Sequence, residues 1–137
     1  MADLIVTPAN VVAGSHAKIE HGIAGAPIAA GQTVYKDPST SRFLLADADA
    51  VTPAARSSFG VALNGAANGQ PLGVITEGNL NPGAAVAVGT IYVLSDTPGG
   101  IMPAADLEPG DFVTILGIAT TVANIAIGVR VSGVAVA

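Results

Sequence analysis

Residues 125–132 read Ile-Ala-Ile-Gly-Val-Arg-Val-Ser, a strict alternation of β-branched apolar residues with small or polar ones. Successive side chains of a β-strand point to opposite faces, so Ile125, Ile127, Val129 and Val131 would share one face. A period of two over eight residues is typical of a half-buried strand and does not fit an amphipathic helix. The stretch therefore predicts a β-strand, and this strand guides the interpretation of the residues around it.

The same strand ends a run without charge that extends from Phe112 to Val129. A run of this length can indicate a membrane-spanning helix. Here, however, it is rich in β-branched residues, and Thr120, Thr121 and Asn124 interrupt it before the alternation begins. The pattern favours two strands joined by a polar turn and argues against a membrane partner.

The rest of the chain follows the same pattern of short apolar runs separated by turn residues, with 17 Gly and nine Pro. Gly, Pro, Asn and Asp between β-branched runs are the usual signals of tight turns. An Ala-rich stretch, Asp47–Arg56, could form one short helical turn. The sequence predicts an all-β fold with strands near Leu4–Thr7, Ala17–Ile23, Thr33–Lys36, Arg42–Leu45, Ser58–Leu63, Leu72–Glu77, Ala84–Val88, Thr90–Ser95, Phe112–Ala119 and Ile125–Ser132.

The chain also contains an internal duplication. Ala30-Gly31-Gln32-Thr33-Val34-Tyr35 returns as Val88-Gly89-Thr90-Ile91-Tyr92, and Phe59-Gly60-Val61-Ala62 returns as Leu116-Gly117-Ile118-Ala119. The two tyrosines are 57 residues apart (92 − 35), as are Gly60 and Gly117 (117 − 60). Two copies are too few for a solenoid, whereas two half-sheets can close into a small barrel that hides its edges. We expect a compact β-barrel with pseudo-twofold halves at about residues 19–76 and 76–133, in which both tyrosines are half-buried with hydroxyls near the surface.

The length of 137 residues suits one domain, which we place at residues 15–137. Residues 1–14 precede the duplicated unit and form either an N-terminal arm or an edge strand of the barrel. As an arm, this segment would add to the sheet edge of a partner, where main-chain hydrogen bonds supply affinity. The candidate partner-binding residues are its apolar members, Leu4, Ile5, Val6, Val11 and Val12.

Composition predicts self-association and excludes one class of partner. Half of the residues are hydrophobic, only 11% are charged and 4% are aromatic, and the mean hydropathy is +0.60. A small Ala/Val core cannot hide that much apolar surface, so burial against other chains is expected. The formal net charge is −5, and the five basic residues are scattered. Nucleic-acid binding needs clustered Lys and Arg, so none is expected here.

The residues that could carry chemistry do not form a recognisable site. Without cysteine, thiolate chemistry and Cys-based zinc sites are excluded. His16, Glu20 and His21 lack the helical spacing of a zinc motif. The acidic residues Asp47, Asp49, Asp96, Asp106 and Asp111 follow no calcium-loop pattern and fit ordinary turn capping. With neither a nucleophile elbow nor a phosphate loop, we expect no enzyme and no catalytic, cofactor or metal site.

The repeated segments carry a resemblance to a known family. Ala30–Tyr35, Phe59–Leu63, Ala87–Ser95 and Leu116–Ala119 resemble small bacteriophage capsid decoration proteins, also called cement or head-stabilising proteins. The resemblance covers about residues 12 to 133. Similar Gly-Thr-x-Tyr turns occur in phage tail-fibre domains, which keeps a tail-fibre or receptor-binding module open as the alternative.

The resemblance implies a structural protein of the virion. It would be a β-barrel that trimerises on the outer capsid surface and clamps neighbouring major capsid subunits. Its partners would be the major capsid protein and two further copies of itself, and no catalytic residue is implied. A sugar-binding tail fibre would use surface aromatics for stacking, and this chain has only two Tyr and three Phe.

Overall fold

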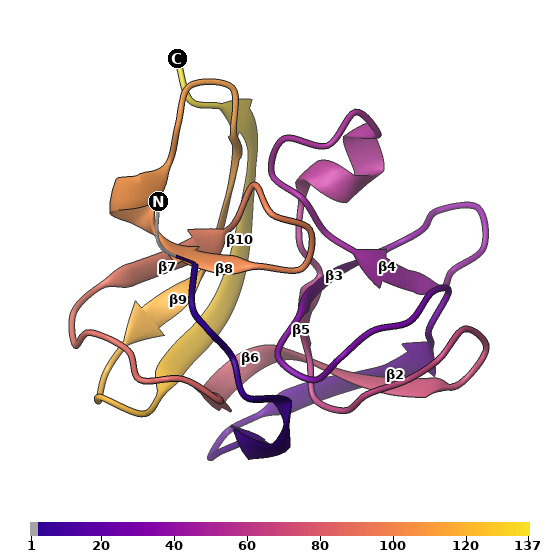
Figure 1. Ribbon diagram of the computed structural model, residues 1–137, viewed down its shortest axis with the longest axis horizontal. Helices are drawn as coiled ribbons and strands as arrows, with labels where there is room; N and C mark the ends of the chain where they lie inside the picture. The colour runs from indigo at the N-terminus through magenta and orange to yellow at the C-terminus, as the bar shows by residue number, and fades with distance from the viewer. Residues whose placement is uncertain (1–2) are drawn as a thin grey trace.

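The computed structural model describes residues 3–137, and it is built almost entirely of antiparallel strands (Figure 1). Strand order along the main sheet is β4-β3-β5-β6-β10-β9-β7-β8, and β1 and β2 also pair with β6. Three short 3-10 helices complete the described chain: η1 (Pro8–Asn10), η2 (Pro53–Arg56) and η3 (Ala104–Asp106). The strands are β1 (Val11–Ala13), β2 (Lys18–Ile23), β3 (Thr33–Lys36), β4 (Phe43–Leu45), β5 (Gly60–Ala62), β6 (Pro71–Pro82), β7 (Ile91–Leu94), β8 (Ile101–Pro103), β9 (Phe112–Ala119) and β10 (Ile125–Ala135).

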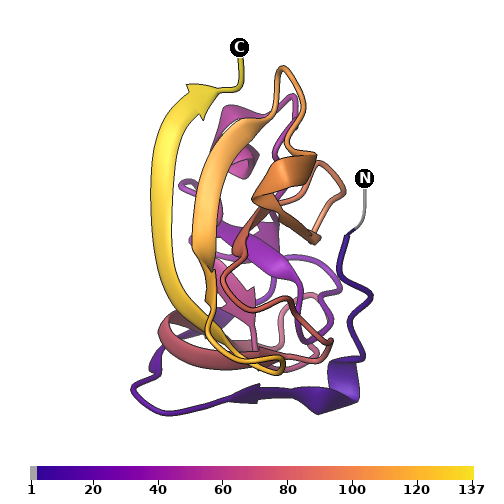
Figure 2. The same cartoon turned by 90° about the vertical axis from the view of Figure 1, so that its left-hand side faces the viewer.

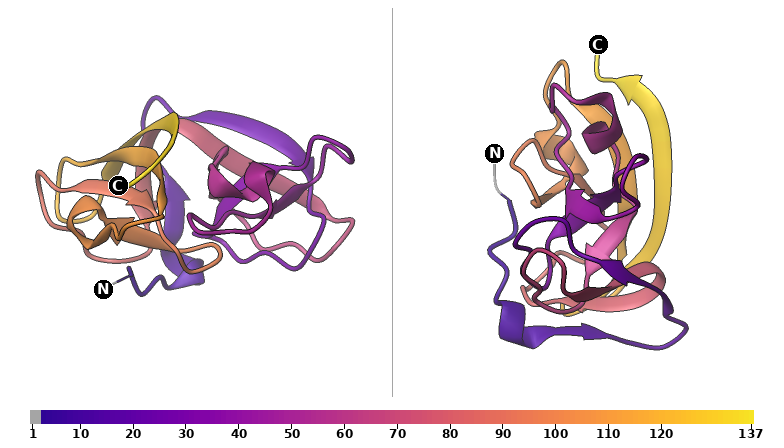
Figure 3. Two further views of the ribbon diagram at one scale, coloured as in Figure 1. Left: turned by 90° about the horizontal axis from the view of Figure 1, so that it is seen from above. Right: turned by 90° about the vertical axis from the view of Figure 1, so that its right-hand side faces the viewer.

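The long strand β6 belongs to both halves of the molecule. Its first part lies between β2 and β5, and the order continues through β3 to β4; its second part pairs with β10, followed by β9, β7 and β8. The two halves therefore repeat one strand order, and they lie side by side with β6 running beneath both (Figure 1). Seen from above they form two lobes (Figure 3, left). The predicted all-β fold with an internal duplication is confirmed, and the sheet curls into a half-barrel.

Equivalent glycines lie two residues before β3 and β7 in the two halves. Gly31 and Gly89 have φ of +89° and +83°, a left-handed conformation that glycine adopts without steric cost. Their N–H groups donate to the carbonyls of Ala62 and Ala119, each at 2.8 Å. The repeated sequence motif is thus a repeated turn, fastened in both halves to the end of the neighbouring strand.

A second pair of equivalent turns has no visible sequence match. The turns Asp37–Arg42 and Ser95–Gly100 follow β3 and β7, and each is closed by an N–H of its first residue donating to the carbonyl of its last, at 2.8 and 3.2 Å. In both turns, the side chain of the first residue also accepts the N–H two residues further on. A carboxylate and a hydroxyl can both do this, which is why the likeness is hidden in the sequence.

The structure corrects the register of the two tyrosines. Because Gly31 corresponds to Gly89, Tyr92 occupies the position of Val34, and Tyr35 lies one place further along its strand. Tyr92 is 3% exposed and its hydroxyl accepts the Ala87 N–H at 3.0 Å. The prediction of a half-buried tyrosine is right for Tyr35 and wrong for Tyr92.

Several strand boundaries differ from those expected. The expected strands Leu4–Thr7 and Ala84–Val88 are not strands, while β1 and β8 were not foreseen. Leu4 and Thr7 each donate one main-chain hydrogen bond, to Ile101 and Gly83. Isolated bonds of this kind hold an extended segment in place but form no ladder. The Ala-rich stretch contains the short helix η2, as expected.

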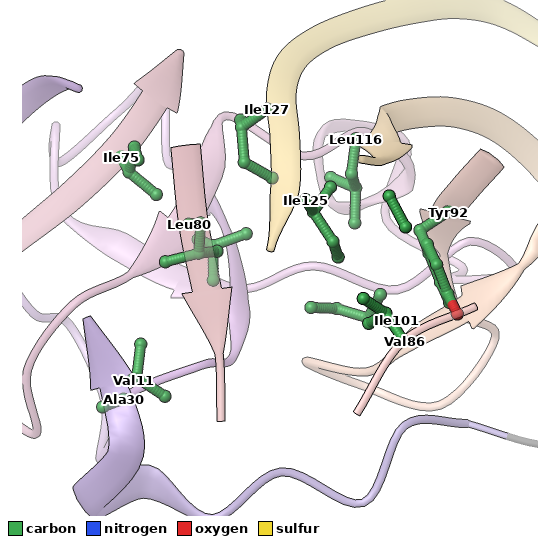
Figure 4. Close-up of a cluster of buried hydrophobic side chains, with 12 residues drawn as sticks. Val11, Ala30, Ile75, Leu80, Val86, Tyr92, Ile101, Leu116, Ile125 and Ile127 are labelled. Carbon is green, nitrogen blue, oxygen red and sulfur yellow. The ribbon is translucent and has the colours of Figure 1, made fainter. Parts of the chain in front are cut away.

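Two main hydrophobic clusters fill the halves. The cluster of the first half contains Ala24, Ile28, Val34, Phe43, Ala62, Ala66, Leu72 and Val74. The larger cluster (Figure 4) contains Val11, Ala30, Val61, Ile75, Leu80, Val86, Tyr92, Ile101, Leu116, Ala119, Ile125 and Ile127. Val61 and Ile75 come from the first half, so the sheet of that half is buried on both faces. Within residues 3–137, no comparable hydrophobic cluster packs on the outer face of the second half, where Ile91 and Ile118 are exposed.

Candidate functional site

The N-terminal segment is folded onto its own chain. β1 pairs with β6, and Val11 is buried in the larger cluster, with Leu4 and Val6 packed partly buried against it. Ile5 and Val12 are 92% and 59% exposed. Among residues 3–14, only Val11–Ala13 form the edge strand that the sequence left open as the alternative. Only two of the five candidate partner-binding residues offer free apolar surface.

Polar contacts fasten the start of this segment to the second half. The Ser95 hydroxyl donates to the Asp3 carboxylate at 2.7 Å, and the Leu4 N–H donates to the Ile101 carbonyl at 2.8 Å. Figure 2 shows the segment lying along one side of the molecule, opposite β9 and β10. Partner binding through Ile5 and Val12 stays a prediction.

Among the described residues, His16 and His21 do not come together with other metal-ligand side chains to form a possible metal site. His16, Glu20 and His21 are all exposed, and His16 lies in the turn between β1 and β2 with φ of 61°. Within residues 3–137, the group of possible ligands that does converge is a set of carboxylates and includes neither histidine.

This acidic cluster consists of Asp49, Asp96 and Asp111, with one carboxylate oxygen of each within 4.8 Å of the others. It joins a loop of the first half to two turns of the second. Asp111 is 3% exposed and one of its oxygens accepts the Glu108 N–H at 3.0 Å. Sequence reasoning treated these residues as separate turn caps, because their proximity depends on how the two halves pack.

Burial and nearby carboxylates raise the pKa of two carboxyl groups of this region, Asp47 and Asp96. Burial raises the pKa of Asp47 to about 6, and the neighbouring Asp49 and Asp96 add to the rise. Burial also raises the pKa of Asp96, with Asp111 the largest charged contributor. Carboxylate oxygens are the ligands that calcium prefers, so Asp49, Asp96 and Asp111 are the described residues that could hold such an ion.

An apolar groove lies on the outer face of the second half. It has a volume of about 450 Å³ and lies over β7, β9 and β10, the two longest of which form one wall of the molecule (Figure 2). Ile91 and Ile118 are paired across β7 and β9 and are 40% and 47% exposed. The one charged residue that lines the groove is Arg130. Apart from Thr120, Arg130 and backbone polar groups, the groove offers a partner aliphatic surface.

The uncharged run that raised the question of a membrane helix forms β9, the polar turn and the start of β10. Across the described residues, no helix is long and apolar enough to cross a membrane.

No family model matches the chain, and no curated protein matches it.

Proposed function

We propose that this chain is a bacteriophage capsid decoration protein, a non-enzymatic homotrimer on the outer surface of the virion that stabilises contacts between major capsid subunits. The proposal builds on the sequence resemblance, whose motifs coincide with the equivalent turns at Gly31 and Gly89 and with the equivalent strands β5 and β9.

The observation that carries the proposal is the apolar groove over β7, β9 and β10, where Ile91 and Ile118 lie side by side and exposed. Monomeric proteins rarely expose contiguous apolar patches, and those that do usually use them for binding other proteins. The exposed large aliphatic residues are Ile5, Val12, Ile19, Ile23, Val51, Val88, Ile91, Ile118, Val122, Val131 and Val134.

A protein of this kind works by mass action. If it binds the assembled lattice and not the free subunits, its binding free energy adds to the stability of the lattice. Three linked copies gain effective concentration, so that modest contacts at each copy give tight binding overall. A net charge of −5 suits the exterior of the particle, away from packaged DNA.

The aromatic residues argue against the tail-fibre or receptor-binding alternative. Stacking on sugars needs exposed rings. Phe43 and Tyr92 are buried, and Tyr35, Phe59 and Phe112 are only partly exposed. Lys36 lies 5.8 Å from the centroid of the Phe59 ring, and the Arg56 guanidinium lies 4.7 Å from that of Phe112, which occupies both rings within the chain.

Co-sedimentation with capsids tests the proposal. Expanded heads of the phage or prophage that encodes the chain, prepared without this protein, are mixed with the purified chain and pelleted. We expect saturable binding to expanded heads and none to free capsid subunits. Equal recovery of the chain in pellets with and without heads would contradict the proposal.

A further inference from the structure

The two halves provide an internal comparison for the groove over β7, β9 and β10. In the first half, Thr33 pairs with Val61; in the second, Ile91 pairs with Ile118. Thr33 and Ile91 each lie two residues after an equivalent glycine, Gly31 or Gly89, so Ile91 corresponds to Thr33. Ile118 corresponds to Val61, since they directly follow Gly117 and Gly60, the glycines against which β10 and β6 pack.

Those two glycines also fix the third position. A Cβ on Gly60 would meet the carbonyl of Ile75, and a Cβ on Gly117 would meet that of Ala126. Ala126 therefore corresponds to Ile75.

The same face is covered in one half and open in the other. Thr33, Val61 and Ile75 are each 0% exposed. Their counterparts Ile91 and Ile118 are 40% and 47% exposed. The repeated surface stays apolar in both halves, although only one of them buries it within the chain.

The cover over the first half comes from the second half. The Thr33 N–H donates to the Gly99 carbonyl at 3.0 Å, and its hydroxyl donates to the Gly100 carbonyl at 3.3 Å. The Gly99 N–H donates to Ala46 at 2.8 Å. The turn Ser95–Gly100 therefore covers Thr33, whereas Val61 and Ile75 are buried in the larger hydrophobic cluster.

The counterpart of that covering turn is exposed in the first half, where its Arg42 side chain donates to the Asn68 side-chain oxygen at 3.1 Å. It is Asp37–Arg42, which closes with the same hydrogen bond and has a left-handed residue, Ser41 with φ of 60°, where the other turn has Gly99 with φ of 76°. Residues 38–42 are all exposed. One molecule therefore presents an uncovered face on its second half and an exposed counterpart of the covering turn on its first half.

We propose that the groove lined by Ile91, Ile118 and Ala126 binds a second copy of this chain, which presents its turn Asp37–Arg42 in the way that Ser95–Gly100 covers Thr33 in the first half. The contact between copies then continues the contact between the halves. Such an interface is heterologous, so each copy uses two different surfaces and a closed ring satisfies all of them.

This inference deepens the self-association part of the proposed function, on which it rests, and is independent of the capsid. Its first test is sedimentation velocity of the free, full-length chain and two matched variants, with circular dichroism to confirm folding. Ile118→Glu places a charge in the groove, and Val51→Glu makes the same change at a residue that is 93% exposed and lies outside it.

We expect the wild type and Val51→Glu to sediment as the same oligomer, and Ile118→Glu to dissociate at least about tenfold more readily, because a central apolar contact would acquire an unpaired charge. Ile91→Lys serves as a second groove variant if Ile118→Glu does not fold. A monomeric wild type, or groove variants that associate like the wild type, would overturn the inference.

The second test uses the absence of native cysteine. Ile91→Cys and Arg42→Cys are purified separately and oxidised alone and as a mixture. A head-to-tail contact predicts a disulfide-linked dimer in the mixture and none with either variant alone. Cross-linking of Ile91→Cys to itself, or no cross-link in the mixture, would contradict it.

Both tests are performed without capsids, so failure here leaves capsid binding to be judged separately. Conversely, oligomers that pass both tests but do not bind heads would overturn the capsid proposal alone.

Discussion

Asp47 shows how the packing of the two halves creates a property that its local sequence does not announce. Its carboxyl is partly buried beside Asp49 and Asp96, which raises its pKa to about 6. A carboxyl whose pKa is higher in the folded than in the unfolded chain binds protons more tightly when folded. Its contribution to stability is therefore favourable at low pH and is lost as the pH rises through 6.

Asp47→Asn should accordingly stabilise the protein at pH 7.5, by about 1 kcal/mol after allowing for solvent screening. The gain should shrink toward zero near pH 4, where the wild-type carboxyl is protonated in the folded state. Urea unfolding at both pH values measures the difference. Glu20→Gln, at an exposed residue, is the control, and a gain that is the same at both pH values would show that charge at Asp47 is not its cause.

At Gly60 and Gly117, the close approach of a neighbouring strand leaves no room for a side chain. Strands β6 and β10 pass so close that a Cβ would collide with a main-chain carbonyl, which cannot move as a flexible side chain can. We expect Gly60→Ala and Gly117→Ala each to lower the free energy of unfolding by about 2 kcal/mol or more.

Gly128→Ala, in β10, is the matched control because nothing lies within 4 Å of its added Cβ. Chemical denaturation compares the three variants. Equal stability of all three would refute the assigned closeness of the strands and, with it, the equivalence of the two halves.

Among the elements, β1 changes the interpretation of the N-terminal segment. A free arm could be removed without loss of stability, but here Val11 is buried in the core while its neighbour Val12 points outward. Val11→Ala should cost about 2 kcal/mol of stability, and Val12→Ala should cost little.

Thermal unfolding of the two variants checks this prediction, and each is the control for the other. If both variants melt like the wild type, the segment is a detached arm. Val12→Asp leaves the core intact, so the capsid binding of this variant measures whether the exposed side of β1 contributes to that binding.

Much of the element order could be predicted, and the reasons are local. Alternation and turn residues located Thr33–Lys36 and Phe112–Ala119 with their observed bounds. β1 and β8 were missed because three-residue strands have too few positions to show a period; β4 and β5, of the same length, were located only as parts of the longer expected strands Arg42–Leu45 and Ser58–Leu63. The length of β6 was underestimated because Gly78 and Asn79, usual turn signals, lie within a continuous strand.

The site was less predictable than the fold, because it depends on contacts between distant residues. The acidic cluster brings together Asp49, Asp96 and Asp111, which no local pattern connects. The apolar groove could not be separated from the core in the sequence, since Ile118 and the buried Val61 lie in matching motifs. Only their different exposure in the folded chain distinguishes them.

At the scale of the whole molecule, the two halves share one strand order and one buried interface, and the second half presents the uncovered version of the same face. This arrangement explains why a chain with 50% hydrophobic residues has aliphatic groups left at its surface. It also connects the proposed self-association with the proposed decoration, because a ring of copies would present its contacts to a lattice together.

The most direct test of the central claim is the heat stability of capsids with and without the protein. DNA release from heads that lack the chain is followed by dye fluorescence during heating, at increasing concentrations of added chain. The account predicts a release temperature that rises with occupancy and reaches a plateau once the sites are full. Full occupancy with no change in the release temperature would contradict a stabilising role.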